Sequence, residues 1–287
     1  MKTWTTGMHT ELLTVRSADG TPLDGVFYTQ ADDSRPVADR VVVNFLHGRT
    51  MTFYVGFQRF AAPGLVAAGY DVLAMNRRSA GIAGIRDSFE SHGDAWTVWS
   101  QHRLDVDAAV AHLHAQGYRR IVMAGHSQGG LLAADYAAKD SDVAALILAS
   151  PASMHRGLPS AFPEAGRGEV AERARAMVAE GKERELILLS MWPWIMSAES
   201  VMDPLRPGAA NPLDELVAQY RGPLLVFCGD AGHDARLLPG ARAAYDRSPS
   251  PTKRLEVLEG GDHFYTGFEA KVTALMVDWL RTHLPPS

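Results

Sequence analysis

Short apolar segments of strand type alternate with helical segments along most of this chain. RVVVNFL (Arg40 to Leu46), YDVLAM and RRIVMA are nearly continuous apolar runs, which are typical of strands covered on both faces. Strict alternation of strand and helix predicts a mostly parallel sheet, with right-handed crossovers and helices on both faces. The sequence therefore predicts an α/β fold.

The individual elements of this fold can be assigned along the chain. TELLTVRSADGTPLDGVFY holds two extended runs around a turn at Asp19-Gly20, and we expect this antiparallel pair at one edge of the sheet. The strands expected after it are RVVVNFL, YDVLAM, RRIVMA, VAALILA, GPLLVFCGD and KRLEVLE. The expected helices cover residues 53–68, 97–116, 131–139, 239–247 and about 266–284.

The alternation is interrupted once, over residues 151–216. This span is helical in character, is broken by prolines and glycines, and contains no clear strand. Because the alternation resumes after it, we expect residues 151–216 to be a helical lid inserted into a core formed by residues 1–150 and 217–287.

Composition excludes several classes of function. The chain of 287 residues is 46% hydrophobic and 21% charged with a net charge of −5, as in ordinary globular proteins. It has no basic stripe for nucleic acid, no signal-peptide stretch, and no apolar run near the ~20 residues that span a bilayer. A single cysteine, Cys228, excludes an internal disulfide and favours a cytoplasmic protein. No metal-ligand spacing is present, so we expect no metal and no cofactor.

A serine enclosed by glycines follows one of the predicted strands. In IVMAGHSQGG, residues Gly125 to Gly129 fit the pattern G-x-S-x-G between a strand and a helix, which is the setting of a nucleophile elbow. The flanking glycines leave room for a sharp turn that lifts the Ser127 hydroxyl clear of the sheet. The alternative is that Ser127 only caps the helix, since serine is a favoured N-cap residue.

A serine nucleophile needs a base and an acid, which follow it along the chain in this architecture. EGGDHF supplies His263 in the loop after the last predicted strand. LLVFCGDAGHDARLLP supplies Asp230 and Asp234 after the preceding strand. We favour Asp234, because a few residues beyond the strand end allow its carboxylate to turn toward the histidine, whereas Asp230 lies close to the strand end.

An oxyanion also needs two hydrogen-bond donors. The first is expected from the backbone N–H of Gln128, the residue after the serine, and the second from the loop FLHGRTMTFY. Gly48 lets the backbone N–H of Arg49 turn inward, so Arg49 is the candidate for the second donor. An ordinary turn with an anion-binding arginine is the alternative.

With LHGRT, GHSQGG, the Asp234 loop and GGDHF in this order, the sequence resembles the α/β-hydrolase fold superfamily and, within it, serine esterases and lipases. The resemblance covers nearly the whole chain. It implies an eight-stranded sheet whose second strand is antiparallel, a catalytic triad of Ser127, Asp234 and His263, and a lid inserted after the sixth strand. DAGHDA is unusual for the acid loop and leaves the choice of acid open.

The expected activity is hydrolysis of a carboxylic ester through an acyl-enzyme. Thioester, amide, lactone and carbon–carbon bond hydrolysis use the same triad, and a non-catalytic ligand-binding protein on this fold is a further alternative. Met191, Trp192 and Trp194 suggest an apolar pocket for a small-molecule substrate of small to medium size, although such residues also anchor lids to cores. The oligomeric state is not predicted.

Overall fold

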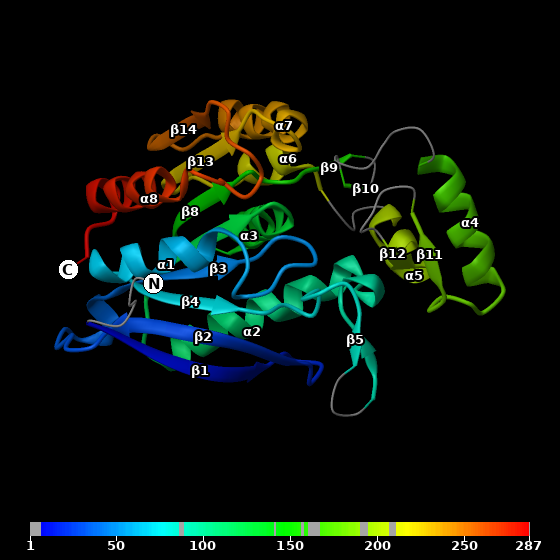
Figure 1. Cartoon of the computed structure of the whole chain (residues 1–287), viewed down its shortest axis with the longest axis horizontal. Helices are drawn as coiled ribbons and strands as arrows, with labels where there is room; N and C mark the ends of the chain where they lie inside the picture. Colours follow the sequence, from blue (N-terminus) through cyan, green and yellow to red (C-terminus); the bar gives the residue numbers. More distant parts are fainter. Residues whose placement is uncertain are drawn as a thin grey trace.

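The computed structural model describes residues 7–85, 89–140, 142–155, 158–159, 167–189, 195–206 and 211–286. Its centre is an eight-stranded sheet (Figure 1). The strands of this sheet are β1 (Met8–Arg16), β2 (Pro22–Gln30), β3 (Val41–Leu46), β4 (Asp71–Met75), β7 (Arg120–His126), β8 (Val143–Ala149), β13 (Leu224–Gly229) and β14 (Lys253–Leu258).

The order of these strands confirms the predicted fold class. It is β1-β2-β4-β3-β7-β8-β13-β14, and β2 runs antiparallel to both of its neighbours while the strands from β4 to β14 are parallel. All residues of β3, β4 and β13 are buried, which explains why these strands are continuous apolar runs in the sequence. The hairpin of β1 and β2 forms one edge, as predicted.

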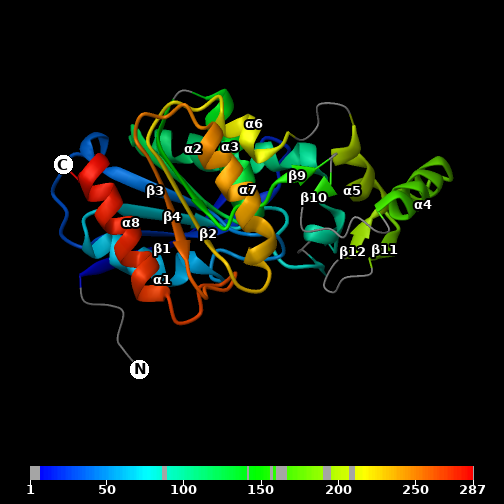
Figure 2. The same ribbon diagram turned by 90° about the horizontal axis from the view of Figure 1, so that it is seen from above.

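Helices cover both faces of the sheet, as Figures 1 and 2 show. Against one face, α1 and α8 enclose one apolar core; against the other, α2, α3, α6 and α7 enclose a second. None of the described helices has both the length and the apolar character needed to cross a membrane. The helices are α1 (Phe57–Ala67), α2 (His102–Ala115), α3 (Gln128–Lys139), α6 (Leu213–Val217), α7 (Asp234–Arg247) and α8 (Glu269–His283).

Several helix boundaries differ from the prediction. The helix expected at residues 239–247 begins five residues earlier, at Asp234, and carries Pro239 in its interior. Proline is typical of a first helical turn because it has no N–H, so the sequence pattern placed this start too late. The helix expected at residues 97–116 begins at His102, because two short 3₁₀ turns, Asp94–Trp96 and Trp99–Gln101, precede it.

The expectation of no strand within residues 151–216 is wrong. Two small antiparallel pairs occur there: β9 (Met154–His155) with β10 (Leu158–Pro159), and β11 (Leu186–Leu188) with β12 (Ile195–Ser197). Strands of two or three residues are too short to show an alternating pattern, so no pattern in the sequence indicates them.

The helices α4 (Arg167–Ala179) and α5 (Ala198–Met202) pack with β11 and β12 into a small unit at the end of the molecule away from both termini (Figure 1). Its own apolar core consists of Ala174, Ile187, Leu189, Met196, Ala198 and Val201.

This unit is attached to the connection between β4 and α2. The Trp96 indole N–H donates to the carbonyl of Arg184 over 3.1 Å, and the backbone N–H of Ser100 donates to the Asp203 carboxylate over 2.8 Å. The connection also contains a hairpin of β5 (Gly84–Ile85) and β6 (Ser91–His92) that the sequence analysis did not identify. The last helix of the 151–216 span, α6, packs instead on α3 and α7.

The turn from β7 into α3 leaves no space for a side chain at two positions, which are both glycine. A Cβ placed on Gly125 would lie 2.2 Å from the carbonyl oxygen of Gly129. A Cβ placed on Gly129 would lie 2.0 Å from the carbonyl oxygen of Leu46 in β3. Both obstacles are backbone atoms that cannot rotate away, so these glycines determine how closely α3 approaches the sheet.

Replacing Gly129 by alanine should therefore destabilise the whole domain. We expect Gly129→Ala to lower the free energy of unfolding by at least about 2 kcal/mol, as overpacking against fixed backbone does. Gly168→Ala is the matched control, since Gly168 lies in α4 with nothing near its Cβ position. This control should be neutral or stabilising by up to about 1 kcal/mol. Urea unfolding measures both, and equal stabilities would contradict the packing argument.

Candidate active site

Ser127 occupies a strained turn between β7 and α3. Its φ of 55° and ψ of −121° lie in a region that L residues rarely adopt. The backbone holds it there: its N–H donates to the Ala149 carbonyl over 3.0 Å, and its carbonyl accepts from the Ala152 N–H over 2.9 Å. Although Ser127 stands at the N-cap position of α3, its side chain makes no capping hydrogen bond. The geometry therefore favours an elbow over the capping alternative.

His263 and Asp234 are in direct contact. His263 lies in the connection between β14 and α8, and its Nδ1 is 2.5 Å from Oδ1 of Asp234, the first residue of α7. Asp230 is directed elsewhere, since its carboxylate accepts the backbone N–H of Gly260 over 2.7 Å. The structure therefore brings Asp234, and not Asp230, to the imidazole.

The Asp234 carboxylate is fully buried and its second oxygen is also occupied. Oδ2 accepts the backbone N–H of Gly229 over 2.9 Å and the hydroxyl of Ser150. The Ser150 hydroxyl is also 2.7 Å from the phenol oxygen of Tyr265. Burial alone raises the pKa of Asp234, but the hydrogen bonds from His263, Ser150 and Gly229 outweigh it and lower the pKa below the ordinary value. An ionised Asp234 fixes the proton of His263 on Nδ1.

His126, the residue before the serine, holds the His263 loop. Its Nε2–H donates to the His263 carbonyl over 2.8 Å, and the two rings lie 4.5 Å apart. Burial, then the neighbouring His263, lowers the pKa of His126 to about 3, so its ring is neutral at physiological pH. A neutral ring with its proton on Nε2 is consistent with the bare Nδ1, which has no partner among the described residues.

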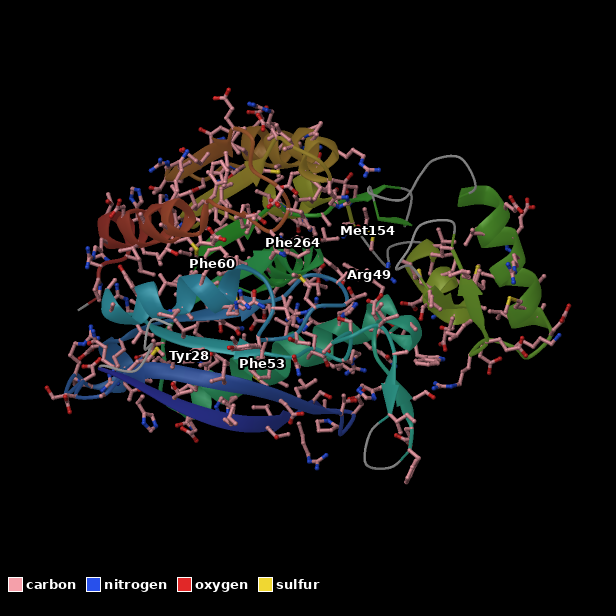
Figure 3. The ribbon with its side chains drawn as sticks, viewed as in Figure 1. Tyr28, Arg49, Phe53, Phe60, Met154 and Phe264 are labelled. Atoms are coloured by element: carbon pink, nitrogen blue, oxygen red, sulfur yellow. The ribbon has the colours of Figure 1, made fainter. Side chains whose placement is uncertain are left out.

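The loop between β3 and α1 lies beside the serine. A Cβ on Gly48 would be 3.3 Å from the Cβ of Ser127, so this loop passes within van der Waals distance of the turn. The Arg49 side chain leaves the loop and pairs with Asp94 of the β4–α2 connection. Arg49 lies on the side of the sheet that faces the small unit formed by α4, α5, β11 and β12 (Figure 3). Gln128 follows Ser127 as the first residue of α3.

The groups that support these residues were not predicted from the sequence. Ser150, which binds Asp234, follows the apolar strand VAALILA directly, and Arg77 follows YDVLAM two residues after its end. A polar residue at the carboxyl end of a buried parallel strand was the signal that could have found both. Met191, Trp192 and Trp194 lie outside the described residues. Among the residues described, no His, Cys, Asp and Glu side chains gather as a metal site.

The strand order with antiparallel β2, and the serine in a strand–turn–helix elbow, define an α/β-hydrolase fold. The family model described as "Alpha/beta hydrolase family" matches residues 45–274. The chain belongs to this family. A comparison with curated proteins finds no match.

Solved structures with this fold match over almost the whole chain. Est1E from Butyrivibrio proteoclasticus with bound ferulic acid is 19% identical, with 95% of this chain and 99% of that chain covered and a TM-score of 0.65. A soluble variant of monoglyceride lipase from Saccharomyces cerevisiae with a substrate analogue is also 19% identical, with coverages of 99% and 98% and a TM-score of 0.71. GrgF, an alpha/beta hydrolase from Penicillium sp. sh18, is 16% identical, with coverages of 96% and 99% and a TM-score of 0.73.

The neutral His126 should make the protein less stable in acid. Its pKa is lowered on folding, so the unfolded chain binds a proton below about pH 6.5 that the folded chain refuses until about pH 3. The free energy of unfolding should therefore fall by up to about 1.4 kcal/mol per pH unit from this group alone as the pH decreases through that window.

The variant His126→Gln isolates this contribution. We expect the pH dependence of its unfolding free energy, measured in urea at pH 7, 6 and 5, to be shallower than that of the wild type. His9→Gln, at an exposed position in β1, is the control and should keep the wild-type slope. Parallel slopes for the wild type and His126→Gln would refute the assignment.

Proposed function

We propose that this protein is a serine hydrolase that cleaves the carboxylic ester of a small to medium, largely apolar substrate. The observation that carries the proposal is the combination of a strained Ser127 with the 2.5 Å pair of His263 and Asp234, whose loop is tied to His126 beside the serine. A serine needs such a base and a carboxylate that orients the base. The esterase and lipase among the structures of the same fold agree with this class of reaction.

The proposed reaction has two steps. The Ser127 hydroxyl attacks the ester carbonyl while Nε2 of His263 accepts its proton, and the backbone N–H groups of Gln128 and Arg49 donate to the oxyanion. Collapse of this intermediate expels the alcohol, which takes the proton from His263, and leaves an acyl-Ser127. Water then attacks the acyl group with His263 as the base, which releases the carboxylic acid and restores the serine. Asp234 stays ionised and stabilises the imidazolium.

An exposed apolar side chain beside the histidine supports an apolar substrate. Phe264 follows His263, its ring lies 5.6 Å from the imidazole, and it is 52% exposed. We propose further that residues 151–216 form a lid over a core of residues 1–150 and 217–287, and that Met191, Trp192 and Trp194 contact the substrate. A cytoplasmic location, favoured by the single cysteine, stays a prediction.

Labelling with a fluorophosphonate probe tests the nucleophile. Intact mass should show one adduct on the wild type and none on Ser127→Ala, and hydrolysis of short-chain aryl esters should fall by at least about 10³-fold in Ser127→Ala. A panel of thioesters, amides and lactones then ranks the bond types. A folded wild type that takes up no probe and cleaves none of these substrates would overturn the proposal in favour of a ligand-binding protein.

Matched aspartate variants test the acid. Asp234→Asn should lower kcat by about 10⁴-fold, because an amide no longer holds the imidazole in the tautomer that accepts the serine proton. Asp230→Asn removes a carboxylate from the same loop that accepts the backbone N–H of Gly260 instead of facing the imidazole, and should stay within a few-fold of the wild type. The reverse ranking of these two variants would assign the acid to Asp230.

A further inference from the structure

A buried arginine lies behind the segments that carry the two proposed oxyanion donors. Arg77 follows β4 at the carboxyl end of the sheet and is only 3% exposed. β4 is paired with β3, and β3 leads directly into the loop that contains Arg49. Arg77 therefore reaches the proposed site from beneath the loop and not from the solvent side.

Arg77 binds both donor segments at once. Its Nη2 donates to the backbone carbonyl of His47 over 2.6 Å, and its own backbone N–H donates to His47 Nε2 over 2.9 Å. The other ring nitrogen of His47, Nδ1, donates to the carbonyl of Gly48 over 2.7 Å, so the whole turn before Arg49 is fixed through Arg77. On the second segment, Nη1 and Nη2 each lie 3.4 Å from the side-chain oxygen of Gln128.

The charge of Arg77 is not neutralised by direct contact. The neighbouring Arg78 pairs with Asp105 and Asp19, and Arg49 pairs with Asp94. No carboxylate of the described residues lies within ion-pair distance of Arg77, whose Nη1 instead meets a ring nitrogen of His102 at 3.1 Å. Burial lowers the pKa of Arg77 to about 10, against the opposing effects of Asp105 and Asp94, so the guanidinium stays charged at neutral pH.

The two histidines in contact with Arg77 carry no charge, whereas Asp105 and Asp94 act on it only from beyond ion-pair distance. Burial and the field of Arg77 hold the pKa values of His47 and His102 well below their ordinary value, so both rings are neutral. A buried cation without a directly paired anion is costly, because it gives up its hydration. In a site of low polarity such a charge attracts an anion that forms nearby much more strongly than it would in water.

We propose that Arg77 is a positioning residue of the oxyanion hole: it fixes the His47–Arg49 turn and Gln128 and supplies positive potential to the oxyanion formed at Ser127. This inference rests on the proposed serine hydrolase function. Arg77 does not touch the substrate; it acts through the His47 carbonyl and the Gln128 side chain. The stabilisation that it gives applies to the tetrahedral intermediate more than to the bound ester.

An aryl trifluoromethyl ketone labelled with ¹³C at its carbonyl tests this role. Such a ketone adds the Ser127 hydroxyl and forms a hemiketal, whose oxygen ionises with a pKa that the ¹³C shift reports. We expect Arg77→Met to raise this hemiketal pKa by at least one unit relative to the wild type. It should lower kcat about ten- to a hundred-fold with little change in KM, less than the roughly 10²–10³ lost when a donor itself is removed.

Three further variants separate positioning from folding. Arg77→Lys keeps the charge and should recover part of the hemiketal pKa. Gln128→Met removes the side-chain oxygen that Arg77 contacts but keeps the backbone N–H, so it should shift the hemiketal pKa in the same direction. This variant tests the role of Arg77 even if Arg77→Met fails to fold. Arg103→Met removes an arginine of α2 that pairs with Asp107 and Asp140, and should leave the pKa unchanged.

The outcomes distinguish this inference from the function on which it rests. If Arg77→Met folds and keeps the wild-type kcat and hemiketal pKa, the role of Arg77 is overturned and the hydrolase function stands. If Arg77→Met does not fold, an unshifted hemiketal pKa in Gln128→Met has the same meaning. A wild-type chain that forms no hemiketal and hydrolyses no ester overturns both.

Discussion

The close approach of α3 to the sheet is the constraint on which the site depends. Gly125 and Gly129 bring the first turn of this helix against the backbone of β7 and β3, with no space for a Cβ at either position. Ser127 lies between them and therefore takes a positive φ, which costs of the order of 1–3 kcal/mol for a residue other than glycine. The backbone hydrogen bonds with Ala149 and Ala152 offset this strain. The position of the Ser127 hydroxyl at this turn is thus a consequence of tight packing.

The parts of the fold that could be predicted are those specified by local pattern. Strands buried on both faces must be continuously apolar, and the elbow requires glycines at fixed spacing from its serine, so β3, β4, β7 and Ser127 are visible in the sequence. The contacts of Ser150 and Arg77 depend on which strand ends are neighbours. That order, β4-β3-β7-β8-β13, is a property of the whole sheet and has no local signature.

Buried ion pairs fix the segments around the proposed oxyanion hole relative to one another. Arg49 pairs with Asp94, whose 3₁₀ turn also contains Trp96. The Trp96 indole donates to the carbonyl of Arg184 in the small unit formed by α4, α5, β11 and β12. Buried ion pairs add little net stability, because desolvation offsets their attraction, but breaking one is costly. Their effect here is on geometry: the proposed donor loop and the unit we propose as a lid are joined to the same short segment.

Asp234 stabilises the folded state, whereas Ser127 is held in a strained conformation by it. Its carboxylate accepts hydrogen bonds from Ser150 after β8, Gly229 at the end of β13 and His263 after β14, so its surroundings exist only when the sheet is complete. Because folding lowers the pKa of Asp234, its ionised form favours the folded state at all pH values above the unfolded pKa. That contribution is lost as the pH falls through the lower, folded value. The serine is strained by the fold, whereas the carboxylate stabilises the edge at which the chemistry is proposed to occur.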